Sequence, residues 1–478
     1  MYTEYNYRCG VDHSALRADG IILNRRGKES TVLTERGIGM WNSKDLKRRS
    51  VLSLGVAMAS ALVLSACSGG SGTTAGPAAD GSSSIVFSTW GTPEELTRFT
   101  EFNTDFMKRH PEIKVKLQPV ASYGEYHSKL LAQLTSKTAP DVFYVGDDKL
   151  GQFVGSKRLM PLDDLMASDA SKTKKDDFFA GTFGAAQQDG ITYAAPNDVN
   201  NDAFWYDKKV LEEVGITEDP ASLAAEGKWT TAKFLEMNDK IAAKGLIGSM
   251  FWNYWATHYG WISTQGGTAY DGSGTFVGNK DPKTLAAVET LGRYFQDKTF
   301  VDADSLPSGA GADSKFVTHK AGFFAQGRYT IGTLKGANVQ EGYDIVDWPT
   351  PDGKPAPTGI AASYLAVNAD TKNKDAAFTY WTEFLSAEGQ KFRLTGGGNA
   401  VPSIKGADGV VLEDNYPKHA QTFLDMRDIG FANYAAEGAV PALSTDVSDL
   451  FLELYQGKSN AQGTLDKVAA LIASKSGK

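Results

Sequence analysis

The chain has 478 residues, with 49 Lys and Arg against 57 Asp and Glu, so its formal net charge is −8. This length exceeds what one hydrophobic core usually serves, which predicts at least two domains. The acidic balance makes nucleic acid and anionic membrane faces poor partners. The only cysteines are Cys9 and Cys67, which excludes a structural zinc–thiolate site, and we expect neither a metal nor a cofactor.

A positively charged segment at 44–49 precedes an apolar run at 50–64. The run holds about 14 apolar residues, too few to span a bilayer as a helix. A basic segment followed by a short apolar core and small residues is typical of an export signal, which we place at 40–66. Residues 1–39 precede this signal and do not fit it, so we expect translation to start at Met40. A peptide from 1–39, detected by mass spectrometry of cell extract, would contradict that start.

The motif LSAC at 64–67 resembles the lipobox of bacterial lipoproteins. In that family the cysteine is acylated and the chain is cut just before it, so the resemblance implies a lipid anchor at Cys67. The Gly-, Ser- and Thr-rich segment 67–84 is expected to be a flexible tether with a reach of roughly 20–25 Å. An ordinary signal peptide with an incidental cysteine is the alternative, and Arg48-Arg49 leaves twin-arginine export open.

Predicted strands and helices alternate in the next segment, which favours parallel strands with right-handed crossovers. In sheets of this kind ligands bind just beyond the carboxyl ends of the strands. Those ends carry Trp90, Tyr123, Asp147 and Asp148, which we therefore expect at a ligand site. In chain order the expected elements are a strand at 84–91, a helix at 92–111 capped by Thr92, a strand at 113–120, a second amphipathic helix and a buried strand at 141–147.

Several later segments, taken in order, resemble family 1 of the extracellular solute-binding proteins, the sugar-receptor components of ABC importers. Each segment is a weak pattern alone, but their order behind a lipobox is specific. The resemblance covers the chain from about Ile85 to its end. The segments are the opening strand ending in Trp90, APDVFYVGD, GITYAAPNDVNNDAFWYDKKVLEEVGI, KWT, HKAGFFAQGRY, DWPTPDG and TGGGNAVP.

The resemblance implies an α/β fold of two lobes, the type II-like periplasmic-binding-protein fold. Each lobe is a mixed or parallel sheet flanked by helices, and the chain crosses the hinge between the lobes more than once. Proline and glycine clusters near 195–199, 349–357 and 395–401 suit these crossings. The N-terminal lobe is then expected at 84–196 plus 356–396, and the C-terminal lobe at 199–350 plus 400–478.

The resemblance also places a sugar between the lobes. Planar Asp, Asn and Arg side chains suit sugar hydroxyls, and aromatic rings suit the C–H faces. For each ring the alternative is a place in the core of a lobe, and for each carboxylate a role in capping a helix or turn. The segment TGGGNAVP offers no aromatic ring at the last crossing, which leaves ligand length open. The expected ligand-binding residues are Trp90, Tyr123, Asp147, Asp148, Asp198, Trp252, Asn253, Trp255, Arg328 and Ser363.

The function implied is that of a receptor, not an enzyme. A sugar or oligosaccharide that touches both lobes favours their closed arrangement, which the transmembrane subunits of an ABC permease then recognise. We expect a monomer, tethered at Cys67 to the extracellular face of the cytoplasmic membrane of a Gram-positive bacterium. Two alternatives are a non-carbohydrate ligand such as a polyol or glycerol phosphoester, and an exported glycoside hydrolase with two carboxylates across the scissile bond.

Overall fold

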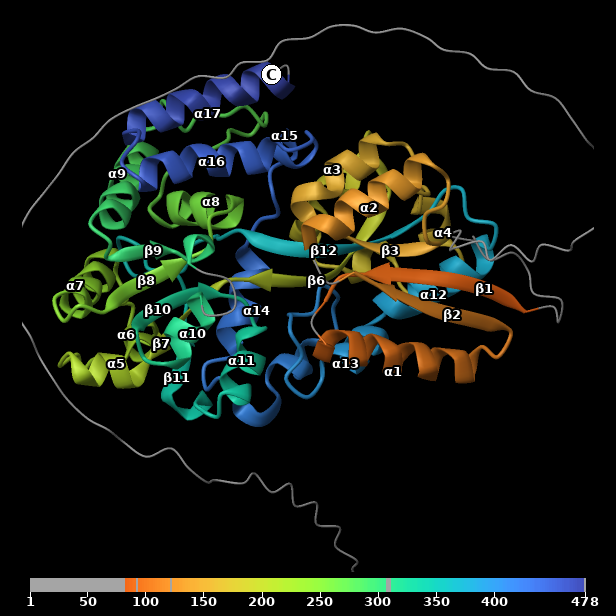
Figure 1. The fold of residues 1–478 in the computed structure, drawn as a ribbon, viewed down its shortest axis with the longest axis horizontal. Helices are drawn as coiled ribbons and strands as arrows, with labels where there is room; N and C mark the ends of the chain where they lie inside the picture. The colour runs from red at the N-terminus through yellow and green to blue at the C-terminus, as the bar shows by residue number, and fades with distance from the viewer. Residues whose placement is uncertain (1–81, 92, 121–122, 307–310, 477–478) are drawn as a thin grey trace, which may run out of the picture. The chain divides into compact units, whose positions relative to one another are not determined.

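The computed structural model describes residues 82–91, 93–120, 123–306 and 311–476 (Figure 1). The chain divides into two units, Met1–Ser68 and Gly69–Lys478, and every described residue belongs to the second. The predicted export signal, Cys67, the Thr92 cap and nearly all of the predicted tether lie outside the described residues. Only the last residues of that tether are described, and Ser83 already begins the first strand.

The first sheet has five strands in the order β2-β1-β3-β12-β6. Its strands β1, β2 and β3 run parallel, which confirms the predicted strand–helix–strand order at this end of the chain. The fourth strand, β12, pairs antiparallel with both β3 and β6, although it comes more than 150 residues later than either. The strands are β1 (Ser83–Thr89), β2 (Ile113–Pro119), β3 (Val142–Gly146), β6 (Ala194–Asn201) and β12 (Ile360–Val367).

Helices cover this sheet because their apolar residues recur on one face. In α1 that face carries Phe99, Phe102 and Phe106, all buried. The ring of Phe87, in β1, lies 5.9 Å from that of Phe99 and 5.2 Å from that of Phe384, in α12. The helices are α1 (Pro93–Arg109), α2 (Tyr123–Thr135), α3 (Asp147–Gly155), α4 (Asp163–Ala167), α12 (Lys374–Leu385) and α13 (Ala387–Leu394), and a small hairpin joins β4 (Gln187–Gln188) to β5 (Ile191–Thr192).

The second sheet also has five strands, in the order β11-β7-β10-β8-β9. Strands β8, β9 and β10 run parallel, and β7 lies antiparallel between β10 and β11. Every residue of β7 is buried, so this strand has the continuous apolar character of the middle of a sheet. The strands are β7 (Ala203–Asp207), β8 (Ile247–Phe251), β9 (Phe300–Asp302), β10 (Ala321–Gln326) and β11 (Tyr343–Val346).

Some of the remaining helices begin at a side-chain cap. Asp219 and Asp281 each accept a backbone N–H at a helix start, and each is followed by proline at the first helical position, an arrangement that favours helix initiation. The helices are α5 (Lys208–Glu213), α6 (Pro220–Ala225), α7 (Thr231–Ala242), α8 (Trp255–Thr264), α9 (Pro282–Gln296), α10 (Ala312–Val317), α11 (Thr330–Gly336), α14 (Gln421–Ile429), α15 (Ala435–Gly438), α16 (Leu443–Tyr455) and α17 (Ala461–Ser476). Short 3-10 turns are η1 (Lys175–Asp177), η2 (Ala180–Thr182), η3 (Gly184–Ala186), η4 (Ala303–Ser305), η5 (Gln340–Gly342), η6 (Asp408–Val411) and η7 (Glu413–Asn415).

The two sheets lie side by side, and β6, paired with β12, is the edge strand of the first sheet (Figure 1). The chain passes from the first sheet to the second at Asp202, between β6 and β7, and returns between β11 and β12. A further link is the bridge between Val199, in β6, and Val401. The lobe limits given above stay predictions. Within the described ranges, none of the helices combines the length and apolar character that a membrane span needs.

Candidate functional site

A cavity of about 1100 Å³ opens beside α16. Its walls come from distant parts of the chain: the end of β6, the loop after β8, the turn after β9, the start of α11 and one face of α16. Aromatic rings and short polar side chains predominate among its lining residues. They are Tyr123, Asn200, Asp202, Trp252, Asn253, Tyr254, Asp302, Asp304, Ser305, Tyr329, Ala361, Thr445, Ser448, Asp449, Leu452 and Gln456.

A second cavity of about 350 Å³ adjoins the first, since the two share Tyr123, Asn253, Tyr254, Thr445 and Ser448. Its other lining residues are Asp147, Asp148, Trp255 and Ser444. We call the two cavities together the cleft. Its lining residues include Asn200 and Ala361, in strands of the first sheet, and Asp302, in a strand of the second. We call the residues on the side of each sheet a wall of the cleft.

The loop after β8 is held rigidly at the cleft. The backbone N–H of Asn253 donates to Asp304 Oδ2 over 2.9 Å, and its side-chain amide donates to the Ser448 carbonyl over 3.2 Å. Its Oδ1 lies 3.0 Å from His258 Nε2. The neighbouring Trp252 ring lies 5.6 Å from the ring of Phe324, in β10. Backbone and side chain are therefore fixed before any ligand arrives.

A hydrogen bond connects the two walls of the cleft. The indole Nε1 of Trp255, the first residue of α8, donates to Asp147 Oδ2 over 2.9 Å. Burial and the neighbouring Asp148 carboxylate raise the pKa of Asp147 to about 7. The position of Asp147 at the start of α3 favours its charged form, because the helix dipole is positive there.

Two further predicted residues join this wall. The Tyr123 hydroxyl donates to Asp148 Oδ1 over 2.5 Å. The other oxygen of Asp148 lies 2.7 Å from Lys149 Nζ. Six of the predicted site residues thus meet in the lining of the cleft: Tyr123, Asp147, Asp148, Trp252, Asn253 and Trp255.

Trp90 is half-buried and lines neither cavity of the cleft. Its ring meets the Tyr123 ring edge-on, with centroids 4.9 Å apart and an interplanar angle of 85°. The rings of Tyr126 and Tyr144 lie at 5.3 and 5.6 Å. Trp90 thus belongs to an aromatic cluster behind Tyr123, and it positions that ring at the cleft.

Asp198 and Ser363 lie together between β6 and β12, outside the cleft lining. The Ser363 hydroxyl donates to Asp198 Oδ1 over 2.9 Å, and Asn197 Nδ2 donates to Oδ2 over 2.5 Å. Burial raises the pKa of Asp198, and the Arg393 guanidinium, 3.9 Å away, opposes that rise. This polar group ties the two central strands to each other.

Arg328 is buried and also lies outside the cleft lining. Its Nη1 donates to the carbonyls of Gly398 and Ala400 over 2.6 and 3.1 Å, and its Nη2 donates to the Val410 carbonyl over 2.6 Å. Burial lowers the pKa of Arg328 to about 10. The guanidinium therefore holds the segment around TGGGNAVP against the start of α11.

Several cleft residues were absent from the predicted set. The Tyr254 hydroxyl donates to Asp202 Oδ2 over 2.5 Å. Asp202 is 6% exposed, and burial raises its pKa to about 7 while the bond from Tyr254 opposes that rise. Asp202 and Tyr254 lie in segments that the sequence analysis identified. Asp449 lies in α16, and the apolar pattern of that helix predicts which residues are buried but not which polar residues line a cleft. The residues missed are Asn200, Asp202, Tyr254, Asp302, Asp304, Ser305, Tyr329, Thr445, Ser448 and Asp449.

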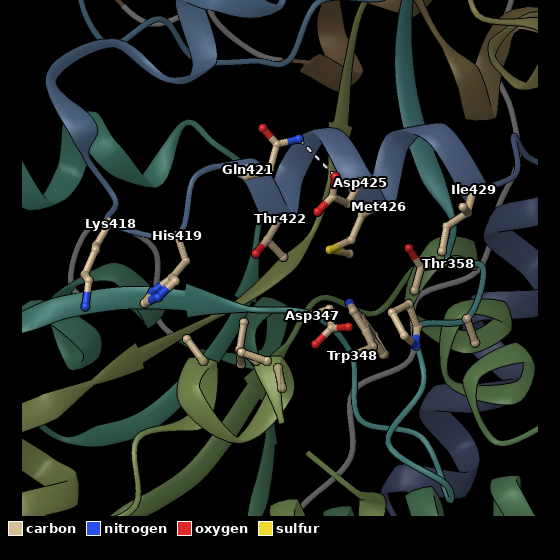
Figure 2. Close-up of a pocket in the computed structure, with 16 residues that line it drawn as sticks. Asp347, Trp348, Thr358, Lys418, His419, Gln421, Thr422, Asp425, Met426 and Ile429 are labelled. Atoms are coloured by element: carbon tan, nitrogen blue, oxygen red, sulfur yellow. Dashed lines mark hydrogen bonds between the residues drawn. The ribbon is translucent and has the colours of Figure 1, made fainter. Parts of the chain in front are cut away.

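A separate cavity of about 360 Å³ shares no lining residue with the cleft. It lies between α6, the segment 346–358 and α14. Figure 2 shows Asp425 and Met426 extending from α14 toward Asp347 and Trp348, and the bond from Gln421 to Asp425. None of the predicted ligand-binding residues lines it.

The family model described as "Bacterial extracellular solute-binding protein" matches residues 90–391. The diacetylchitobiose binding protein DasA of Streptomyces coelicolor is 27% identical over 414 residues, which cover 84% of this chain and 88% of that protein.

Two solved structures share the fold. One is the ABC substrate-binding protein Lmo0181 from Listeria monocytogenes in complex with cycloalternan, with a TM-score of 0.72 and 19% identity, covering 82% of this chain and 98% of that one. The other is the GacH receptor of Streptomyces glaucescens, with a TM-score of 0.68, 20% identity and the same coverage. They confirm the expected two-lobe α/β architecture. The chain belongs to the bacterial extracellular solute-binding protein family.

Proposed function

We propose that this protein is the receptor of an ABC importer, and that it captures a sugar or oligosaccharide by hinge closure and delivers it to the transmembrane permease subunits. The observation that carries the proposal is the cleft, whose lining mixes aromatic rings with carboxylates and amides and comes from both sheets. Rings offer large contact area to sugar C–H faces at small entropic cost, and the polar groups satisfy the hydroxyls. A ligand that touches both walls binds the closed arrangement more tightly than the open one.

The relatives support a carbohydrate ligand. DasA is described by its diacetylchitobiose ligand, Lmo0181 was solved with cycloalternan, and GacH was solved with acarbose. We propose that the six predicted residues in the lining contact the sugar. We propose that Trp90, Asp198, Arg328 and Ser363 hold the walls of the cleft in position. Binding requires no covalent chemistry, so the protein acts as a receptor and not as an enzyme.

Attachment to the cell follows from the sequence motif. We propose that Cys67 is acylated and that the tether holds a monomeric receptor on the extracellular face of the cytoplasmic membrane of a Gram-positive cell. A membrane tether keeps the loaded receptor close to its permease, which raises the effective concentration of one for the other.

Thermal melting with a panel of neutral, anionic and amino saccharides, from mono- to tetrasaccharides, tests the receptor function. A ligand at 100 times its dissociation constant stabilises the native state by about 2.7 kcal/mol, so the true ligand class raises the melting temperature clearly. Calorimetry then gives the affinity, and X-ray scattering reports closure. The proposal is wrong if no saccharide raises the melting temperature, produces heat or changes the scattering curve. Turnover of chromogenic glycosides would indicate an enzyme instead.

A further inference from the structure

The charged side chains that line the cleft are negative. Among the residues that line its two cavities are six carboxylates, and no Lys, Arg or His is found among them. Lys149 lies beside this lining, with Nζ 2.7 Å from Asp148 Oδ2, and it donates to Thr445 Oγ1 over 3.4 Å. The carboxylates are Asp147, Asp148, Asp202, Asp302, Asp304 and Asp449.

Asp202 is buried without a full set of partners. Its side chain is 6% exposed, and Oδ2 accepts the Tyr254 hydroxyl. Within the described part of the chain no side chain or backbone N–H donates to Oδ1, and the residue lines the larger cavity, so this oxygen can accept a hydrogen bond from a ligand. Burial of the residue raises the pKa of Asp202 to about 7.

Asp302 lines the same cavity and is 8% exposed. Its Oδ1 accepts the backbone N–H of Asp304 over 3.0 Å, and in the described ranges no side chain donates to its carboxylate. Burial raises the pKa of Asp302 to about 6. Two carboxylates, both more than nine-tenths buried, thus line one cavity that has no cation among its described lining residues.

We propose that the saccharide bound by this cleft carries a protonated amine, so that the ligand class is an amino sugar or a saccharide with an equivalent cationic group. This inference rests on the proposed function. An ammonium group supplies three N–H donors, of which one satisfies Asp202 Oδ1, and its charge compensates the buried carboxylates. Trp252, Tyr254 and Tyr329 line the same cavity, and aromatic rings attract cations. A phosphorylated or uronic ligand brings like charge to a cleft without a basic lining residue and is rejected.

The test compares three β-1,4-linked disaccharides that differ only at C2, those of glucosamine, N-acetylglucosamine and glucose. By calorimetry we expect the glucosamine disaccharide to bind at least about tenfold more tightly than either neutral one, as a charge-assisted hydrogen bond provides. The difference decreases as salt is added, because salt screens charge. Equal or tighter binding of a neutral disaccharide overturns this inference and leaves the sugar receptor standing. Absence of binding by every saccharide in the larger panel overturns both.

A substitution tests whether Asp202 causes the preference for the amine-bearing disaccharide. Asp202→Asn keeps the shape and the acceptor for Tyr254 but removes the charge, so the ratio of glucosamine to glucose disaccharide affinity falls about tenfold. Asp425→Asn, on α14 outside the cleft (Figure 2), leaves the ratio unchanged. We expect Asp302→Asn to lower the ratio in the same way. It is used in place of Asp202→Asn if circular dichroism shows that Asp202→Asn does not fold. An unchanged ratio in the folded variant overturns the inference.

Discussion

Trp255 and Asp147 bond to each other across the cleft, from helices that flank different sheets. The indole donates at 2.9 Å to a carboxylate that begins α3. Removing this bond by Trp255→Phe keeps most of the ring volume and frees the two walls from each other. We expect X-ray scattering of the ligand-free variant to show a larger radius of gyration, because the open arrangement gains population.

A matched variant separates opening from simple loss of a hydrogen bond. Trp261 is also buried, and its indole donates over 2.9 Å to the Ala287 carbonyl, within the helices that flank the second sheet. Trp261→Phe should lower the free energy of unfolding by about 1 kcal/mol and leave the scattering curve unchanged. If both variants give the wild-type curve, the Trp255–Asp147 bond does not hold the walls together.

The Trp252 ring lines the cleft, whereas the Trp90 ring lies behind Tyr123. Trp252→Ala should therefore weaken saccharide binding by about 10- to 100-fold, the range for loss of a central aromatic contact. Trp90→Ala should mainly lower the melting temperature and weaken binding less, through the displaced Tyr123 ring. Calorimetry and thermal melting on both variants distinguish the two roles. A larger affinity loss for Trp90→Ala than for Trp252→Ala would indicate that the Trp90 ring stacks directly on the ligand.

Arg328 donates to backbone carbonyls and not into the cleft. Arg328→Lys loses the planar fork that reaches several acceptors at once and leaves buried carbonyls without donors, at a cost of about 2–3 kcal/mol in unfolding free energy. Denaturant unfolding measures this loss. Saccharide affinity at a temperature where the variant is folded should stay near the wild-type value. A large affinity loss in the folded variant would favour the original prediction that Arg328 contacts ligand.

Much of the fold was predictable because its signals are local. Phe99, Phe102 and Phe106 recur at helical spacing, and β3 is a short apolar run that ends in two carboxylates. The placement of β12 between β3 and β6 is a long-range pairing that periodicity cannot specify. The family resemblance predicted only that residues 356–396 return to the N-terminal lobe, without a strand order. The cleft residues were also predictable only in part. Asp147 and Asp148 were predicted because they follow the end of a strand. Asp449 was missed, because the sequence of α16 predicts its buried face but not what lies opposite its polar face.

Glu437 gives a pH dependence with a defined sign. It is fully buried in α15, where it accepts the hydroxyls of Tyr259 and Tyr270. Burial raises the pKa of Glu437 to about 7, while the tyrosine bonds oppose that rise. The unfolded chain releases this proton near pH 4.3, so between about pH 4.5 and 7 the folded state holds the proton that the unfolded state has lost. Stability from this group is therefore present at low pH and is lost as pH rises toward 7.

We expect the free energy of unfolding to fall by roughly 3 kcal/mol between pH 4.5 and 8 on account of Glu437. Asp147 and Asp202 carry pKa values raised to about 7 and add slopes of the same sign. Glu437→Gln removes one contribution, so urea unfolding across this range should give a shallower slope than in the wild type. Glu453→Gln, at an exposed carboxylate paired with Lys467, serves as the control, since its lowered pKa gives it no such slope between pH 5 and 8. A Glu437→Gln slope equal to that of the wild type would show that the buried carboxyl does not hold its proton near neutral pH.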